Sequence, residues 1–164
     1  MLPLDYSSIA SSYDSLHSEE QLRKLRIIAS ELAITPKTTI LDVGSGTGLS
    51  KILGGKITGI EPSGRLRKLS RINAVKGVAE KLPFKDSSFD IVVSVTAAHN
   101  FSNKEKAIKE IARVAKNAAV VTILKSSKHA KLLERLLRKH FSVDKIIGET
   151  HDYIFFLSAK HKLY

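Results

Sequence analysis

The stretch Ile40–Ser50, "ILDVGSGTGLS", joins a short apolar run to three glycines at alternate positions, Gly44, Gly46 and Gly48. The apolar run predicts a buried β-strand that ends near Val43. Glycines in this spacing let the backbone approach a ligand closely and adopt unusual φ values. A strand that leads into such a loop is typical of α/β proteins, which bind ligands at the carboxyl ends of parallel strands.

The rest of the chain alternates between apolar runs and helical patterns. Continuous apolar runs, as expected for strands covered on both faces, predict strands at Thr38–Val43, Lys56–Glu61, Asn73–Ala79, Phe89–Thr96 and Ala118–Leu124. The 3.6-residue period predicts a short helix after Gly48 and helices at Ser63–Ile72, Asn103–Lys116 and Lys128–His140. The C-terminal run of residues 141–160 predicts a hairpin broken at Thr150–Asp152.

These elements predict an α/β fold of the Rossmann-like kind. Repeated strand–helix units imply a mostly parallel sheet with helices on both faces, and the last strands add an antiparallel hairpin. Five strands and a hairpin give seven strands in all. In such sheets the ligand lies at the carboxyl ends of the strands beside the first strand.

The N-terminal residues do not show the alternation of apolar runs and helical patterns that the rest of the chain shows. Residues 1–17 are short of long aliphatic side chains and rich in Ser and Tyr, which predicts a loop or a short docking segment. Ser18 and Gln21 match a capping box, so we expect a helix to begin at Ser18 and to end before Pro36. The predicted organisation is a segment 1–17 that covers cofactor or substrate, followed by one domain over 18–164.

Composition excludes several kinds of site. The chain has 164 residues, 43% of them hydrophobic, which suits one domain with its own core. It has no cysteine, so disulfides, thiolate metal sites and cysteine nucleophiles are excluded. The six histidines show no metal-ligand spacing, so we predict no metal. We see no leader and no long apolar run, which predicts a cytoplasmic protein without membrane insertion. A single methionine and no cysteine hint at a thermophilic source.

The formal net charge of +11 favours anionic partners. The basic residues, however, are spread over several predicted helices. Solvated lysine-rich helix faces explain them without any partner, and a nucleic-acid surface is the alternative. Composition alone leaves both interpretations open.

The glycine loop does not fit the common phosphate-binding patterns. Leu49 and Lys51 stand where a dinucleotide fingerprint needs its third glycine, and no Gly-Lys-Ser/Thr follows for a P-loop. Asp42, just before the loop, is a poor neighbour for pyrophosphate and suits a ligand with a cationic end. Glu61 closes the next predicted strand, where an acid can accept hydrogen bonds from both hydroxyls of a ribose. Asp42 and Glu61 together predict a nucleoside ligand that carries a positively charged group.

Four segments, in order, resemble motifs of the class I S-adenosylmethionine-dependent methyltransferases of the type 11 group. They are "IASSYD", "ILDVGSGTG", "ITGIEPS" and "VKGVAEKLPFKDSSFDIVVS", which together span residues 9–100. The resemblance implies S-adenosylmethionine as cofactor and S-adenosylhomocysteine as product. One position departs from the group: Val78 stands where an Asp often receives the adenine amino group.

The resemblance also implies roles for individual residues. Asp42, Val43, Gly44, Ser45 and Gly46 would hold the methionine part of the cofactor. Glu61, followed by Pro62, would bind the ribose, and Ala79 and Glu80 would lie along the adenine edge. Thr96 would lie near the cofactor after the fourth strand, and Tyr13 would close over the methionine carboxylate. His99, in "TAAHNF", would take a proton from the acceptor; an equally good interpretation is that it orders the loop.

The predicted function is methyl transfer by direct displacement to an oxygen, nitrogen or carbon nucleophile. A small-molecule acceptor is favoured by the resemblance, and an RNA or protein acceptor by the charge. A non-catalytic cofactor-binding subunit is the third alternative. Because the loops are short, a homodimer or another subunit could complete the pocket.

Overall fold

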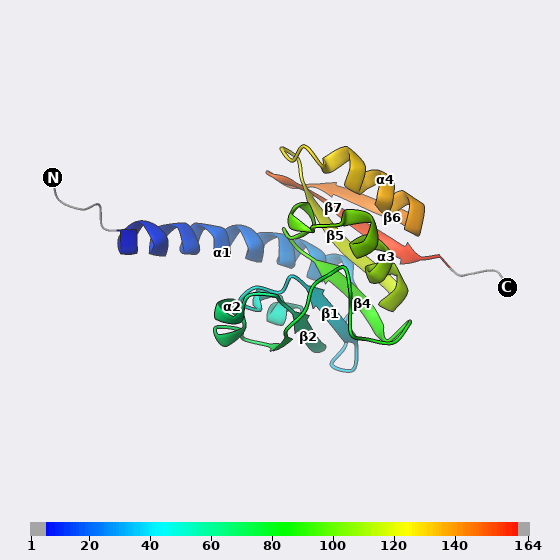
Figure 1. The fold of residues 1–164 in the computed structure, drawn as a ribbon, viewed down its shortest axis with the longest axis horizontal. Coiled ribbons are helices and arrows are strands. Elements are labelled where there is room, and N and C mark those ends of the chain that lie inside the picture. Colours follow the sequence, from blue (N-terminus) through cyan, green and yellow to red (C-terminus); the bar gives the residue numbers. More distant parts are fainter. Residues whose placement is uncertain (1–5, 161–164) are drawn as a thin grey trace.

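A computed structural model describes the backbone of residues 6–160 and the side chains of residues 15–160. Seven strands form a mixed sheet in the order β3-β2-β1-β4-β5-β7-β6 (Figure 1). The strands are β1 (Thr39–Val43), β2 (Lys56–Ile60), β3 (Asn73–Val75), β4 (Phe89–Ser94), β5 (Ala115–Leu124), β6 (Phe141–Gly148) and β7 (Asp152–Ala159). The strands β1 to β5 are parallel, whereas β7 is antiparallel to both β5 and β6. The predicted mostly parallel sheet with a C-terminal antiparallel hairpin is confirmed.

Helices cover both faces of this sheet. They are α1 (Tyr6–Glu31), α2 (Gly64–Lys68), α3 (Lys104–Val114) and α4 (Ala130–His140), with short 3-10 turns η1 (Leu49–Leu53) and η2 (Ala98–Asn100). Within residues 6–160, none of the helices is long and apolar enough to cross a bilayer.

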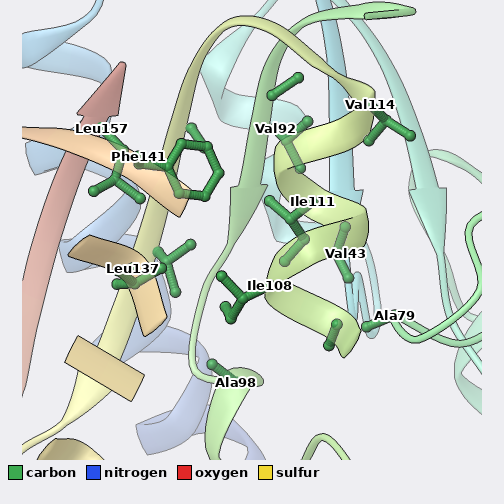
Figure 2. Close-up of a cluster of buried hydrophobic side chains, with 14 of the residues drawn as sticks. Val43, Ala79, Val92, Ala98, Ile108, Ile111, Val114, Leu137, Phe141 and Leu157 are labelled. Carbon is green, nitrogen blue, oxygen red and sulfur yellow. The ribbon is translucent and has the colours of Figure 1, made fainter. Parts of the chain in front are cut away.

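Two apolar clusters hold the layers together. On one face, Ile108 and Ile111 of α3 and Leu137 of α4 pack on Val43, Val92 and their neighbours (Figure 2). On the other face, Leu25 and Ile28 of α1 and Leu53 of η1 pack on Ile40, Ile91 and other strand residues. Each strand residue points to the face opposite its neighbour, so the continuous apolar runs of the sequence serve both clusters.

The predicted start of α1 is wrong. The helix begins at Tyr6 instead of Ser18, so residues 6–17 are helical and do not form a loop. No glycine or proline occurs between Pro3 and Pro36, and nothing in this stretch therefore breaks a helix. The Ser18–Gln21 pattern lies inside the helix and is not a cap. The first turns of α1 extend beyond the sheet (Figure 1).

Several other boundaries also differ from prediction. The third strand stops at Val75, and the chain stays close to β2 beyond it: a Cβ on Gly77 would lie 2.5 Å from Ile60 Cδ1. The fourth strand stops at Ser94, since Thr96 has a left-handed φ of 54° that no strand accommodates. The fifth begins at Ala115, directly after α3. The topology is unaffected by these shifts.

Candidate functional site

A cleft of about 880 Å³ opens at the carboxyl ends of β1, β2 and β4, beside α1. The strand order reverses next to β1, which is where doubly wound sheets bind ligands. Most residues predicted for the cofactor line this cleft: Asp42, Gly44, Ser45, Gly46, Glu61, Pro62, Ala79, Glu80 and Thr96. They come from four segments of the chain that the fold brings together.

The glycine loop forms the floor of the cleft. Gly44, Gly46 and Gly48 have φ values of 75°, 54° and 76°, in the left-handed region that glycine adopts without strain. A Cβ on Gly44 would lie 2.7 Å from Ala97 Cβ, so the loop after β4 closes tightly on this position. A Cβ on Gly46 would meet no atom within 4 Å, since it would point into open space. The backbone at Gly46 is therefore bare toward the cleft.

Glu61 connects the glycine loop to the second strand. Its Oε1 accepts a hydrogen bond from the backbone N–H of Gly46 at 3.1 Å, and its Oε2 accepts one from Ser63 at 2.7 Å. The side chain is 6% exposed and lines the cleft. A carboxylate oxygen has two acceptor sites, so each oxygen keeps one for a ligand hydroxyl. Two adjacent ribose hydroxyls match this geometry.

Asp42 lies beneath the loop and is 5% exposed. Burial, together with the nearby Glu61 carboxylate, raises the pKa of Asp42 to about 6. The group is therefore ionised at neutral pH at a cost in stability. A cationic ligand placed above Asp42 would relieve that cost. The hydroxyl of the neighbouring Ser45 is buried and has no hydrogen-bond partner among the described residues.

The loop after β3 forms one end of the cleft. Glu80 Oε1 accepts a hydrogen bond from the backbone N–H of Asn103 at 3.1 Å, just before α3 begins. Arg113 of α3 holds the following segment by donating to the carbonyls of Leu82 and Phe84. Val78 is 46% exposed and lines the cleft, with no carboxylate at that position. Part of the bonding capacity of Glu80 is thus used to hold α3.

Thr96 follows β4 and is held by groups that the sequence did not reveal. Its backbone N–H donates to Thr122 Oγ1 at 2.7 Å, and its hydroxyl lies 2.9 Å from Lys24 Nζ and 3.1 Å from Gln21 Oε1. Lys24 also bonds Asp152 Oδ2 at 3.0 Å, and both side chains are fully buried. A signal was present: Lys24 occupies the same helix face as Leu25 and Ile28, where an apolar residue is expected.

Three predicted site residues are not among the described residues that line the cleft: Val43, His99 and Tyr13. Val43 is fully buried in β1 and belongs to the apolar cluster under α3. His99 lies in η2, between Ala98 and Asn100, but is not among the residues that line the cleft. Burial lowers the pKa of His99, and its Nδ1 has no hydrogen-bond partner among the described residues. The side chain of Tyr13 lies outside the described residues.

Sequence reasoning missed a wall of the cleft. The helix α1 contributes His17, Ser18, Gln21 and Leu25, and the segment after α2 contributes Arg71. His17 belongs to the segment predicted to cover cofactor or substrate, whereas Ser18, Gln21 and Leu25 belong to the predicted helix, to which no role at the cleft was assigned. Helical spacing from Leu25 back to Gln21 and His17 would have placed all three on one face.

One group of side chains has the spacing of a metal site. Glu20, Glu149 and Asp152 each offer an oxygen, and these oxygens lie within 4.8 Å of one another. The ammonium of Lys24 already lies 3.2 Å from Glu20 and 3.0 Å from Asp152. It supplies there the positive charge that a metal ion would otherwise bring.

Comparison with known proteins agrees with this geometry. The sequence profile of the family described as "Methyltransferase domain" (type 11) matches residues 41–123. The chain is 31% identical to an uncharacterized protein of Methanocaldococcus jannaschii, over 70% of this chain and 47% of that protein. It is also 31% identical to a demethylmenaquinone methyltransferase of Chlorobaculum tepidum, over 73% of this chain and 57% of that enzyme. It thus spans about half the length of the curated relatives that it matches.

A solved structure supports the fold. The crystal structure of a SAM-dependent methyltransferase from Thermotoga maritima superposes with a TM-score of 0.76 at 24% identity, covering 94% of this chain and 98% of that one. The matched profile spans half of the sequence, including β1, the glycine loop and Glu61. The chain belongs to the class I S-adenosylmethionine-dependent methyltransferases of type 11.

Proposed function

We propose that this chain binds S-adenosylmethionine in the cleft beside α1 and transfers its methyl group to a small, uncharged acceptor. The observation that carries the proposal is the joint placement of Asp42 and Glu61 in the lining of one cleft, with Glu61 bonded to the bare backbone of Gly46. The carboxylates suit the cationic and the ribose parts of one ligand. A volume of about 880 Å³ lies in the range of small-molecule sites and leaves room for an acceptor.

The residues fit the cofactor in a definite direction. Glu61 and Pro62, at the end of β2, would hold the ribose, and Ala79 and Glu80 would flank the adenine. Asp42, at the end of β1, would face the amino group of the methionine part. This order runs along the sheet from β3 toward β4, so the methyl group would point to the loop after β4 and to α1.

Methyl transfer requires mainly that the protein align the acceptor atom with the methyl group and the sulfur of the cofactor. A bound sulfonium supplies an already activated methyl group. Gln21 and Leu25 of α1 and Ala97 and Phe101 after β4 all line the cleft, and they would hold the acceptor in line and keep water out. An acceptor that loses a proton needs a base. The sequence predicts His99 for that role, but His99 is not among the described residues that line the cleft.

The lining of the cleft favours an uncharged acceptor. Five acidic or basic residues of the described lining lie on the β1–β3 side: Asp42, Glu61, Arg65, Arg71 and Glu80. The half formed by α1 and the loop after β4 is apolar or neutral, apart from His17: Ser18, Gln21, Leu25, Val95, Thr96, Ala97, Asn100, Phe101 and Ser102. A nucleic-acid acceptor would bring phosphates that need Lys or Arg nearby, and the described lining of this half contains neither.

A short-chain demethylmenaquinone analogue is the first acceptor to assay, since a relative is named for that substrate. Transfer of labelled methyl groups from S-adenosylmethionine should be measured with this analogue, with charged phenols and with total RNA. We expect neutral acceptors to be methylated and to respond little to salt. Labelling of RNA, with binding that falls steeply as salt rises, would contradict the small-molecule proposal.

A further inference from the structure

A buried ion pair lies beside the cleft, outside the residues assigned to the cofactor. Lys24 Nζ of α1 lies 3.0 Å from Asp152 Oδ2 at the start of β7, and both side chains are 0% exposed. Removing two charges from water is costly, and apolar side chains of similar size often stabilise a fold as well or better. Packing alone therefore does not explain why charges occupy this position.

The pair acts on the cleft through Thr96. Lys24 Nζ lies within hydrogen-bond distance of Thr96 Oγ1 (2.9 Å), in addition to its contacts with Asp152 and Glu20. An ammonium has three donors, so these three acceptors use all of them. Thr96 Oγ1 also lies 3.3 Å from Asp152 Oδ2. Both members of the ion pair therefore lie within hydrogen-bond distance of the Thr96 hydroxyl.

Thr96 needs such support because its backbone is strained. Its φ of 54° is in the left-handed region, which is costly for a β-branched residue. The following residue, Ala97, approaches the glycine loop so closely that a Cβ on Gly44 would lie 2.7 Å from its Cβ. Asn100 and Phe101, four and five residues on, line the cleft. The conformation of Thr96 therefore sets the spacing between two sides of the site.

The same pair fixes the opposite wall. Lys24 lies one position before Leu25 and three after Gln21, and both of those side chains line the cleft. Because Lys24 bonds a group on β7 and a group after β4, α1 is held against the sheet at the level of the cleft. When the walls of a cleft are ordered before binding, less of the binding free energy is lost in ordering them, and the affinity is higher.

We propose that Lys24 and Asp152 are positioning residues for the cofactor: they hold Thr96 and α1 so that the cleft is formed in advance. The proposal rests on the proposed function, because S-adenosylhomocysteine is the ligand whose affinity reports on the cleft. Neither residue is among those that line the cleft, so their effect would be indirect.

The decisive variant is Lys24→Met with Asp152→Asn, which removes both charges and keeps the side-chain volumes. The chain offers a matched control in Lys145→Met with Glu31→Gln. That ion pair, at 2.8 Å, also joins α1 to the sheet, but it is exposed and lies at β6. For each variant, Tm and the Kd of S-adenosylhomocysteine by calorimetry should be measured beside the wild type.

We expect the buried-pair variant to fold and to bind S-adenosylhomocysteine about 10-fold more weakly, because its cleft would have to become ordered when the ligand binds. The control should stay within about twofold of the wild type, as exposed pairs contribute little. A folded buried-pair variant with wild-type affinity would show that the pair is only a structural anchor and would overturn the proposal.

The single variant Asp152→Asn covers the case in which the double variant does not fold. Here amide hydrogen exchange of residues 97–101 should be measured without ligand. Faster exchange there, with unchanged exchange in β1, supports the positioning role, and unchanged exchange in both segments overturns it. Wild-type protein that binds no S-adenosylhomocysteine would contradict the proposed function, and the exchange result would then decide the positioning claim by itself.

Discussion

The backbone N–H of Gly46 donates a 3.1 Å hydrogen bond to Glu61 Oε1, which makes the glycine loop and the end of β2 one unit. The other oxygen of Glu61 is fixed by the backbone N–H of Ser63 at 2.7 Å. Both bonds orient the carboxylate before any ligand arrives. The residue proposed to hold a ribose thus also holds the loop over which the rest of the cofactor would lie.

Replacing Glu61 by Ala should weaken S-adenosylhomocysteine binding by about 1–3 kcal/mol, since charge-assisted hydrogen bonds to the ribose are lost. Glu134→Ala, which breaks an exposed ion pair with Arg138 on α4, is the control and should leave affinity unchanged. Calorimetry on both variants measures the effect. Wild-type affinity in Glu61→Ala would remove Glu61 from the site.

Gly46 and Gly54 offer a comparison for testing the loop. Both have positive φ, 54° and 75°, and a Cβ on either would meet nothing within 4 Å. An alanine at either position should cost stability through backbone strain, about 1–3 kcal/mol, and Gly54, whose ψ of −169° lies in a region essentially confined to glycine, should tolerate alanine no better than Gly46. Only Gly46 lines the cleft.

We expect Gly46→Ala to lose S-adenosylhomocysteine binding, because its methyl group would project where the ligand lies, while Gly54→Ala binds normally. Thermal unfolding and calorimetry on the two variants separate strain from steric exclusion. Equal affinity in both would mean that the ligand does not pass over Gly46.

Asp42 should oppose folding and support binding. Its pKa of about 6, against an ordinary 3.8, means that the ionised group destabilises the fold by about 3 kcal/mol. This destabilisation is absent below pH 3.8, grows as the pH rises, and is complete above pH 6. Asp42→Asn should therefore raise the free energy of unfolding at pH 8 and have little effect on it at pH 4.

The same substitution should weaken S-adenosylhomocysteine, which carries an amino group, more than adenosine, which does not. Wild-type affinity for S-adenosylhomocysteine should likewise decrease as the pH falls below 6. Chemical denaturation at both pH values and calorimetry with both ligands make the comparison. An Asp42→Asn variant that is less stable at pH 8, or that binds both ligands as the wild type does, would contradict this account.

His99→Gln should keep S-adenosylhomocysteine affinity and most of the turnover, because His99 does not line the cleft. His17→Gln is the companion variant, since His17 does line it. Turnover with an acceptor found by screening should be measured for both. A loss of about 100-fold in kcat for His99→Gln with unchanged affinity would show that His99 acts as the base that the sequence predicted.

The sequence predicted the sheet because its signals are local. Apolar runs such as Ile40–Val43 mark buried strands, and the alternate glycines mark the sharp loop that follows. Asp42 and Glu61 could be placed at one cleft because each lies at the end of a strand, and parallel strands bring their carboxyl ends together. The fold, and the residues that line the cleft at the ends of β1 and β2, could thus be predicted from the chain.

The other side of the cleft was not readable, since it depends on contacts between distant segments. The left-handed Thr96 is held by Lys24 and Asp152, and no local pattern pairs a residue of α1 with one of β7. The helical start at Tyr6 was missed because Ser-rich stretches favour caps and turns in isolation. His99 was predicted to act at the cleft from a motif, but in the fold it is not among the described residues that line the cleft.

The most direct test of the central claim is calorimetric titration of the unmodified protein with S-adenosylhomocysteine and, separately, with NAD. We expect S-adenosylhomocysteine to bind with a micromolar or lower Kd, a binding free energy of about −8 kcal/mol or more favourable, and NAD to show no measurable binding. Tight binding of NAD with none of S-adenosylhomocysteine would contradict it.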